Sequence, residues 1–374
     1  MNDKKLAILG LVAVVSVAAA ILVSRIGGVS QSSSLVIGPL IGGVDVDKIN
    51  SIVVTGEKGT QKVTLVKSEK RFVVAEKENY PASTKKVNEL VNQCLDIRTA
   101  ELQSEDPAFH AELGLTDETA KTAVTFKDSA GQTIVGLLVS ESKPESQEVF
   151  VRRADDNKAY LTLQSPWISS RPLDYLDTQL LQVDAKKILE VSVIDPNQVG
   201  YTLRSDNGGD VVTLGEMPAG KQFKGTTYRS VFSTLSSLNF EDVSPKDKVE
   251  GLTLDRRYIC KLDDSTVYTL DLGKKEEKWY LKLKVEFTDK SEVVKEKGVE
   301  SEEELKKKEA KLLARDAAEA LIKKTGNWLY VIPQFKAAEL TKSLNELIED
   351  VPVKPKEPAD PNKPVEAQAQ PPQV

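Results

Sequence analysis

The chain opens with one long apolar run, which starts at Leu6, ends at Val23 and contains no charged residue. At 1.5 Å per helical residue, this run is just long enough to cross a hydrocarbon core of about 30 Å. We therefore predict a transmembrane helix. A cleaved signal peptide is the alternative, with small residues from Ala18 to Ala20 near a cut, but the apolar residues that continue to Val23 favour an uncleaved anchor.

The charges around this run indicate its orientation. Lys4 and Lys5 precede it and Arg25 follows it. Because positive charge tends to stay on the cytoplasmic side, we expect a single-pass protein of the inner (cytoplasmic) membrane, with the N-terminus inside and the bulk of the chain periplasmic or otherwise extracytoplasmic. Residues 1–23 are then a short cytoplasmic end and the anchor. Residues 24–44, rich in Ser and Gly, are predicted to be a flexible tether.

Beyond the tether, the pattern of short alternating runs repeats itself at a spacing of roughly 138 residues. Each copy opens with Asp-x-x-Lys-Ile, at Asp45 and at Asp184. A strand, a hairpin, a helix, a second hairpin and two closing strands follow. Hairpins imply antiparallel pairing, so we predict an α+β fold of two tandem, mainly antiparallel sheet-plus-helix repeats, at residues 45–183 and 184–350. One continuous sheet across both copies is the alternative.

Two segments depart from the repeat. Residues 290–325 are rich in Lys and Glu, and Ser301 with Glu304 forms a capping box, so we expect a helix inserted into the last hairpin of the second copy. We expect a solvated helix packed by a narrow stripe, and a partner-binding arm is the alternative. The stripe consists of Leu305, Leu312, Leu313, Ala317, Ala320 and Leu321.

The second departure is the C-terminal tail, residues 351–374, where Pro recurs at every third position from Pro352 to Pro364. Polyproline II has three residues per turn, which would align these prolines on one ridge. We expect a disordered tail, and a docking ligand or a spacer is the alternative.

Composition excludes several classes of protein. With 40% hydrophobic and 29% charged residues, the 374-residue chain is no polytopic membrane protein. Its formal charge is -6, and its Lys and Arg residues are interleaved with acids, with no cluster that acids do not offset, which weighs against nucleic acid as a partner. Neither a P-loop nor a G-x-G-x-x-G motif occurs, so we expect no nucleotide. Cys94 and Cys260 are predicted to be two separate buried thiols, with one disulfide as the alternative.

Candidate chemistry is sparse. No C-x-x-C or H-E-x-x-H motif occurs and His110 is the single histidine, so we expect no metal and no other cofactor. A hydrolase triad around His110 lacks a G-x-S-x-G nucleophile, and we predict a surface histidine instead. The acidic pairs Asp155-Asp156 and Asp263-Asp264 are typical of turns, as is the segment at residues 206–210, which lacks the spacing of a calcium loop. We expect no enzyme.

The three tryptophans differ in context. Trp279 and Trp328 lie in strand-like runs and are predicted to be core residues. Trp167 follows Ser165-Pro166 and precedes a helical segment, so it is the one candidate ligand contact.

The order of these motifs resembles that of a bacterial family called domain of unknown function 4340. The resemblance extends over roughly residues 45–350 and includes the duplication. It implies a membrane-anchored envelope protein, often encoded beside components of gliding-motility-type ABC transporters, and it brings no catalytic residues. The motifs that carry it are Ile49-Asn-Ser-Ile-Val-Val54, Arg71-Phe-Val-Val74, Tyr80-Pro-Ala-Ser83, the helix from Val87 to Leu95, Leu113-Gly-Leu115 and a strand containing Gly136.

The sequence thus leads to three hypotheses. The first is a noncatalytic, membrane-anchored extracytoplasmic accessory or binding protein that contacts an ABC transporter permease or another envelope protein. The second is an envelope hydrolase or glycan-binding module with a carboxylate-lined cleft near Trp167. The third is a structural spacer.

Overall fold

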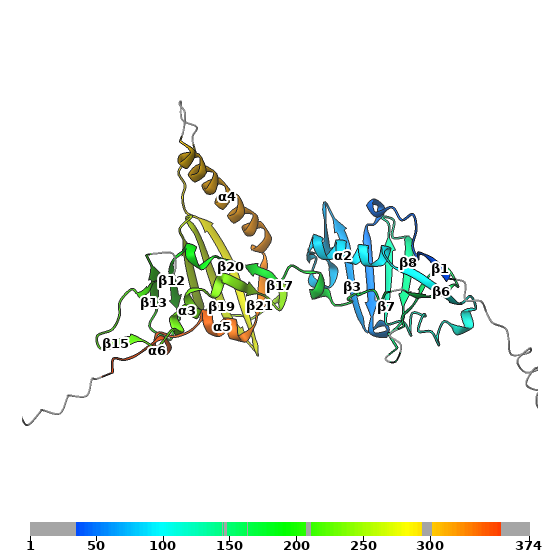
Figure 1. Cartoon of the computed structure of the whole chain (residues 1–374). Helices are drawn as coiled ribbons and strands as arrows, with labels where there is room; N and C mark the ends of the chain where they lie inside the picture. The colour runs from blue at the N-terminus through cyan, green and yellow to red at the C-terminus, as the bar shows by residue number, and fades with distance from the viewer. Residues whose placement is uncertain are drawn as a thin grey trace, which may run out of the picture. The chain divides into compact units, whose positions relative to one another are not determined.

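The computed structural model describes residues 35–143, 145, 148–162, 164–206, 211–293 and 301–352. The predicted membrane segment, from Leu6 to Val23, and the tail beyond residue 352 lie outside them. Among the residues described, none of the helices combines the length and the apolar character needed to cross a membrane. The chain forms two compact units, one up to Thr178 and one from Gln179 (Figure 1). The repeat pattern places this boundary at residues 183 and 184.

The first unit is built on a ten-stranded antiparallel sheet of order β1-β6-β10-β9-β8-β7-β2-β3-β4-β5. In the described part of this unit, the α-helix is α2, Thr84–Leu95. The strands are β1 Leu35–Pro39, β2 Ser51–Gly56, β3 Gln61–Ser68, β4 Arg71–Val74, β5 Tyr80–Pro81, β6 Arg98–Ser104, β7 Thr122–Lys127, β8 Thr133–Val139, β9 Phe150–Arg153 and β10 Ala159–Thr162.

The main core of the first unit lies between this sheet and α2 (Figure 1). Strand β2 alternates strictly between buried and half-buried positions, so Ile52 and Val54 point to the core. Helix α2 buries Val87 and Leu90, which stand three residues apart on one face of the helix. A smaller cluster covers part of the opposite sheet face. It contains Leu115, Ala120, Leu138, Phe150 and Ala159.

The second unit carries an eight-stranded antiparallel sheet of order β14-β13-β12-β18-β19-β20-β21-β17 and two two-stranded sheets, β11-β16 and β15-β22. Its helices are α3 Thr227–Phe232, α4 Glu302–Thr325, α5 Gln334–Leu340 and α6 Leu344–Leu347. Its strands are β11 Gln179–Leu181, β12 Ile188–Ile194, β13 Tyr201–Ser205, β14 Val212–Leu214, β15 Lys221–Phe223, β16 Leu238–Asn239, β17 Asp242–Pro245, β18 Arg256–Leu262, β19 Thr266–Lys275, β20 Lys278–Phe287, β21 Trp328–Ile332 and β22 Ile348–Asp350.

Buried tyrosines tie the helices of this unit to one face of its sheet. Tyr258 of β18 is fully buried, and its hydroxyl donates to the carbonyl oxygen of Val231 in α3 at 2.8 Å. The hydroxyl of Tyr201 in β13 donates to the carbonyl oxygen of Lys342. Each phenol therefore contributes apolar area to the core and satisfies its polar end at a helix or just beyond one. The other face of the sheet is free of these helices.

The sheets confirm the α+β class and mainly antiparallel pairing, and they show that the single-sheet alternative is wrong. When the outermost strands β1 and β5 are left out, the first sheet has the order β4-β3-β2-β7-β8-β9-β10-β6. The second sheet has the order β14-β13-β12-β18-β19-β20-β21-β17. Each strand of one order is the sequential counterpart of the strand in the other. In both units, the helix comes between the first and the last strand of this order. The duplication read from the sequence is therefore a duplication of topology.

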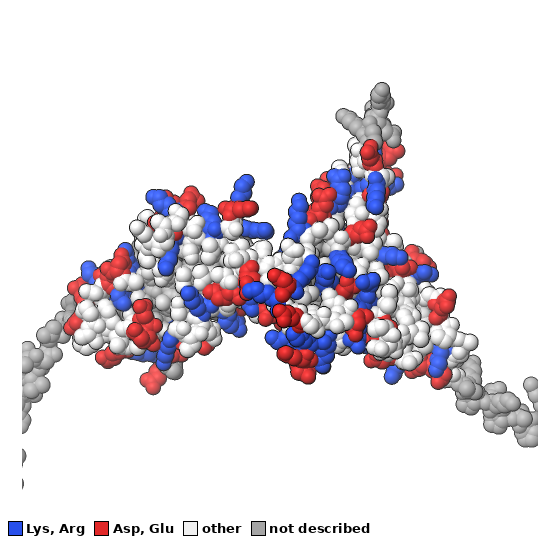
Figure 2. Space-filling view, turned by 180° about the vertical axis from the view of Figure 1, so that it is seen from behind, with Lys and Arg blue, Asp and Glu red and all other residues white. Residues whose placement is uncertain are grey.

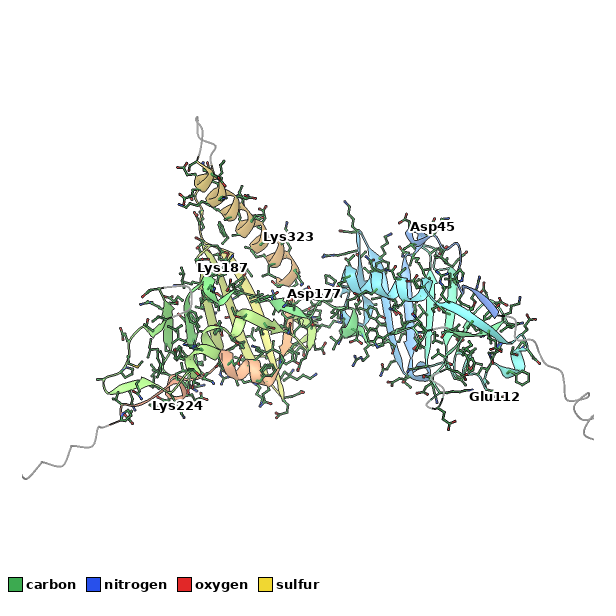
Figure 3. All side chains as sticks on the ribbon, in the orientation of Figure 1. Asp45, Glu112, Asp177, Lys187, Lys224 and Lys323 are labelled. Atoms are coloured by element: carbon green, nitrogen blue, oxygen red, sulfur yellow. The ribbon has the colours of Figure 1, made fainter. Side chains whose placement is uncertain are left out.

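Local structure repeats as well. Asp45 accepts a hydrogen bond from the amide of Asp47, and Asp184 accepts one from Lys186, so each copy begins with a capped 3-10 turn (Asp45 and Lys187 are labelled in Figure 3). Gly114 and Gly251 both adopt positive φ, at 70° and 69°. Left-handed backbone of this kind favours Gly, which explains the matching Gly-Leu pairs.

Two expectations need correction. The segment at residues 24–44 is not a free tether in its described part, because Leu35–Pro39 pairs with β6 as β1. The helix expected in the second copy is short, because α3 ends at Phe232 and is followed by a 3-10 turn, Thr234–Ser237. The hydroxyl of Ser233 bonds back to the carbonyl oxygen of Arg229, a contact that competes with helix continuation.

The charged insert is a helix, as predicted, and it stands between the paired strands β20 and β21. Ser301 and Glu304 form the predicted capping box. The predicted packing stripe is only partly right, however: Leu312 and Leu321 are half-buried and line hollows shared with β20 and β19, but other leucines of the stripe are exposed. Leu305 is 53% exposed and Leu313 is 63% exposed, whereas Ala318 and Thr325 are the buried residues of α4. The helix docks through small residues near its C-terminal end, close to Lys323 (Figure 3), and presents leucines to solvent.

Candidate functional site

His110 is structural. It is buried, contrary to the predicted surface position, and its Nε2 donates to the carbonyl oxygen of Asn157 at 2.8 Å. This contact ties the turn after Pro107–Phe109 to the loop between β9 and β10. The imidazole is therefore held as a packing and hydrogen-bonding group rather than aimed at a nucleophile.

The acidic pairs lie at turns, as predicted. Asp155 accepts a bidentate hydrogen bond from Arg153, and Asp263 and Asp264 form the turn between β18 and β19. The segment at residues 207–210 lies outside the described residues. No group of three His, Cys, Asp or Glu side chains suited to a metal ion is found among the described residues.

Both cysteines are free and fully buried, and they belong to different units. Burial raises the pKa of each thiol to about 12. A thiol with such a pKa carries almost no thiolate at neutral pH and is a poor nucleophile. The prediction of two separate buried thiols is confirmed, and the disulfide alternative is wrong.

Trp167 is 71% exposed. It directly follows Pro166 in the sequence, and Pro166 is part of the lining of a small polar hollow of about 270 Å³ in the first unit. Asp96 is the carboxylate of its lining. Hydrolysis of a glycosidic bond ordinarily uses two facing carboxyl groups, so the predicted carboxylate-lined cleft is not found at this hollow. Its lining is rich in amide groups: Asn92, Gln93, Asp96, Ile97, Arg98, Gln164, Ser165 and Pro166.

The other two tryptophans, Trp279 and Trp328, are half-buried, so the prediction that they are core residues is wrong. The guanidinium carbon of Arg256 lies 5.3 Å from the ring centre of Trp279, and its Nε donates to the buried carboxylate of Asp195 at 2.9 Å. Trp279 thus covers an ion pair through a cation–π contact with its cation.

The strongest concentration of charge lies on the helix-free face of the eight-stranded sheet. Strand alternation and register place its members there, because residues directly opposite on neighbouring strands share a face. In one row, Arg204, Glu190 and Lys261 stand opposite one another on β13, β12 and β18. In a second row, Arg257, Asp271 and Lys282 do the same on β18, β19 and β20. Lys284 follows two residues after Lys282, on the same side.

In each row, one carboxylate is shared by two cations. Glu190 binds Lys261 at 2.7 Å and Arg204 at 3.0 Å. Asp271, which is 8% exposed, binds Lys284 at 2.6 Å and Arg257 at 2.7 Å. The hydrogen bond from Lys261 holds the pKa of Glu190 below its usual value. Burial raises the pKa of Asp271, but hydrogen bonds from Lys284 and Arg257 outweigh it, and the net pKa is lowered.

One further lysine, Lys246, extends this surface. Desolvation lowers the pKa of Lys246, and repulsion from Lys282 and Lys284 lowers it further. Lys246 is therefore within electrostatic range of both of these lysines. Neither Lys246 nor Lys282 has a carboxylate partner within the part of the chain that the structure describes. We define the basic face as Arg204, Lys246, Arg257, Lys261, Lys282 and Lys284, with Glu190 and Asp271 between them and with Glu286 two residues after Lys284 on the same side of β20. Lys and Arg side chains are seen gathered over the unit that carries α4 in Figure 2.

The sequence did not reveal this surface. The six cations form no run in the sequence, since they come from three strands and the turn after β17. The available signal was the spacing of two residues between Lys282 and Lys284, which puts both on one face of a strand. Recognising the surface also required the register of β18 to β20. The cations give the face a local positive charge on a chain whose formal charge is -6.

Comparison with known proteins identifies a family and no activity. Residues 73–257 match the family described as Domain of unknown function (DUF4340). This is the family that the sequence motifs resemble. The match runs from β4 of the first unit into β18 of the second, so it spans the junction of the two copies. No curated protein matches the chain, and no solved structure matches it.

Proposed function

We propose that this chain is a noncatalytic binding protein of the cell envelope, anchored in the membrane through residues 6–23, and that its basic face binds an acidic surface of a partner protein. The observation that carries the proposal is the surplus of positive charge in the two rows, where each acid serves two cations. Electrostatic complementarity speeds association and selects partners of opposite charge. The family resemblance suggests an ABC transporter permease, or another envelope protein, as that partner.

The basic face suits binding better than catalysis. Its side chains pair with one another at ordinary ion-pair distances, and the cations at its centre are exposed or half-buried. Nothing in this arrangement activates a nucleophile or positions an acid and a base across a cleft. A partner carboxylate can, however, bind Lys246 and Lys282 without first breaking an ion pair. These two lysines are therefore the residues at which we expect recognition.

The test is a crosslinking pull-down of the full-length protein from native membranes, with identification of the proteins recovered. The variant K246Q/K282Q removes two charges from the basic face while leaving both shared carboxylates paired. The variant K62Q/K67Q removes two exposed charges from β3 of the first unit and is its charge-matched control. We expect the first variant to reduce partner recovery at least five-fold and the control to retain it.

Ionic strength gives a second readout. Binding through exposed charges weakens as salt screens them, over a Debye length of about 8 Å at physiological ionic strength. We expect recovery to fall as salt is raised from about 0.05 to 0.3 M. Equal recovery by both double variants, or recovery that does not change with salt, would show that the basic face does not hold the partner.

A second candidate function is glycan binding at the hollow beside Trp167. It is favoured by the exposed indole of Trp167, which directly follows Pro166 of the lining, and by the amide side chains of that lining, which both donate and accept hydrogen bonds. An aromatic ring and such polar groups together are suited to a sugar ring. Titration with soluble peptidoglycan fragments tests it by tryptophan fluorescence. W167A should abolish the signal, and F335A, which removes a different aromatic residue that is 64% exposed, should not. An unchanged titration of W167A would exclude this site.

A further inference from the structure

The two copies differ at one edge of their shared strand order. In the first unit, β4 does not end the sheet, because β5 pairs with it: Val73 lies opposite Pro81 and Val74 opposite Tyr80. Tyr80 is fully buried there. The counterpart of β4 in the second unit is β14, and it is the outermost strand of its sheet. The first copy thus supplies a strand that the second copy lacks at the corresponding position.

The second copy has a strand at the corresponding place in its sequence, but that strand pairs elsewhere. In each copy, a short strand stands between the edge strand and the helix: β5 before α2, and β15 before α3. Strand β15 pairs with β22 near the C-terminal end of the described chain, and the amide of Lys224, labelled in Figure 3, donates to Leu347. Because β15 is engaged by β22, it does not cover β14 in the way that β5 covers β4.

The register shows which groups of β14 point outward. The amide of Gly215 donates to Thr202, so Thr202 and Gly215 form a hydrogen-bonded pair. Such pairs alternate along an antiparallel ladder, which makes Thr213 and Arg204 the next one. Val212 and Leu214 therefore direct their amides and carbonyls away from β13. In the described part of the chain, neither amide has a hydrogen-bond acceptor.

The opposite edge strand is protected in a way that β14 is not. Strand β17 ends in Pro245, which has no amide to donate, and proline on an edge strand discourages further pairing. Strand β14 contains Val212, Thr213 and Leu214, with neither proline nor charge. It therefore retains the features of an edge that accepts another strand.

The surroundings of β14 define the chemistry of an added strand. A hollow of about 640 Å³ lies beside it, and Leu214, Met217 and Val199 are part of its lining. Val199 is 75% exposed and Ile194, also in the lining, is 46% exposed, so apolar surface is available there. Arg204 of the basic face stands opposite Thr213, is exposed and is also part of this lining. An added strand would therefore meet apolar residues and a cation at the same hollow.

We propose that β14 accepts an extended segment of the partner protein as an additional antiparallel or parallel strand, which carries apolar residues for the hollow and acidic residues for Arg204 in its lining. Main-chain hydrogen bonds to Val212 and Leu214 hold the segment, and the alternating side chains select it. This inference deepens the proposed function, and rests on it, by naming how an acidic partner protein is held. It assigns the second copy a binding role that the first copy, closed by β5, does not have.

The test uses the full-length protein in detergent and a labelled seven-residue peptide that alternates Val and Glu. A Val and Lys peptide is the charge control, and a Val and Glu peptide N-methylated at alternate amides is the backbone control. Binding is followed by fluorescence anisotropy and by residue-resolved amide hydrogen exchange. We expect at least ten-fold tighter binding of the Val and Glu peptide than of either control. We also expect ten-fold slower exchange at Val212 and Leu214 on binding, with Thr213 unchanged.

The variant V212P provides the matched change in the protein. Proline is tolerated where an edge amide faces outward, so this variant should keep its fold, checked by circular dichroism, and lose peptide binding at least ten-fold. Slow exchange of the Val212 and Leu214 amides in the free wild-type protein would overturn the proposal, since the edge would already be covered. So would peptide binding that leaves both amides unprotected. K246Q/K282Q should retain peptide binding, which separates failure of the edge from failure of the basic face.

Discussion

At the scale of single residues, the basic face depends on carboxylates that are shared rather than paired one to one. Asp271 is the clearest case, because it is 8% exposed and contacts both Arg257 and Lys284. Removing a buried charge that two cations share leaves those cations to repel one another. Asp271 therefore stabilises the same cations that give this surface its positive potential.

Substitution D271N should lower the free energy of unfolding at pH 7 by roughly 1–3 kcal/mol, since the amide cannot satisfy both cations. The pKa of Asp271 is lowered on folding from the ordinary value of 3.8. Its contribution is therefore complete above that value and is lost as pH falls through the folded pKa. Urea unfolding at pH 7 and at about pH 3 should show the difference between wild type and variant shrinking in acid. D263N, at an exposed turn, should stay within about 0.5 kcal/mol of wild type throughout.

The cysteines give a second residue-scale prediction. Cys94 and Cys260 are buried thiols with a pKa of about 12, so a maleimide should not label the folded protein at pH 7. In urea, two labels per chain should appear, and a reducing agent should not change the melting temperature. Rapid labelling under native conditions, counted by mass spectrometry, would contradict this account of both sites.

At the scale of elements, the sequence predicted what local pattern determines and missed what depends on long-range packing. The strand at Arg71–Val74 and the capping box at Ser301 follow from alternation and from side-chain chemistry. The stripe on α4 followed only in part, because which side of a helix docks depends on what it meets, and α4 meets the sheet through Ala318. For the same reason, the basic face needed the strand register, and β1 needed a partner strand, β6, far along the chain.

The two capping boxes differ in what they support. Ser301 caps α4, whose first turns expose Leu305, whereas Ser343 caps α6, which buries Leu347 completely. Loss of such a cap costs about 1 kcal/mol. S301A should therefore speed amide exchange only in the first turns of α4, with no change in melting temperature. S343A should lower the global stability of the second unit by about 1 kcal/mol. Equal effects of the two substitutions on melting would show that α4 supports the core along its whole length.

At the scale of the whole molecule, duplication produced two units of one topology and different surfaces. The first unit has both edges of the shared strand order closed, by β1 on β6 and by β5 on β4. The second unit gained a charged helical insert and leaves β14 as an edge. This edge is therefore open in one copy only. That arrangement is favourable, because an exposed edge that binds a partner can also pair with unintended strands.

Because each unit has its own sheet and core, we predict that residues 35–178 and residues 179–352 fold when produced separately. A domain of about 150 residues buries roughly 68–70% of its unfolded surface, which is enough for cooperative stability. Each fragment should show one cooperative thermal transition and a near-ultraviolet circular dichroism signal. L65D, which places a charge at a position with no exposure, should abolish both in the first fragment and serves as the control. A second fragment that unfolds without cooperativity would mean that its open edge was acquired at the expense of independent folding, and that the first copy still supports it.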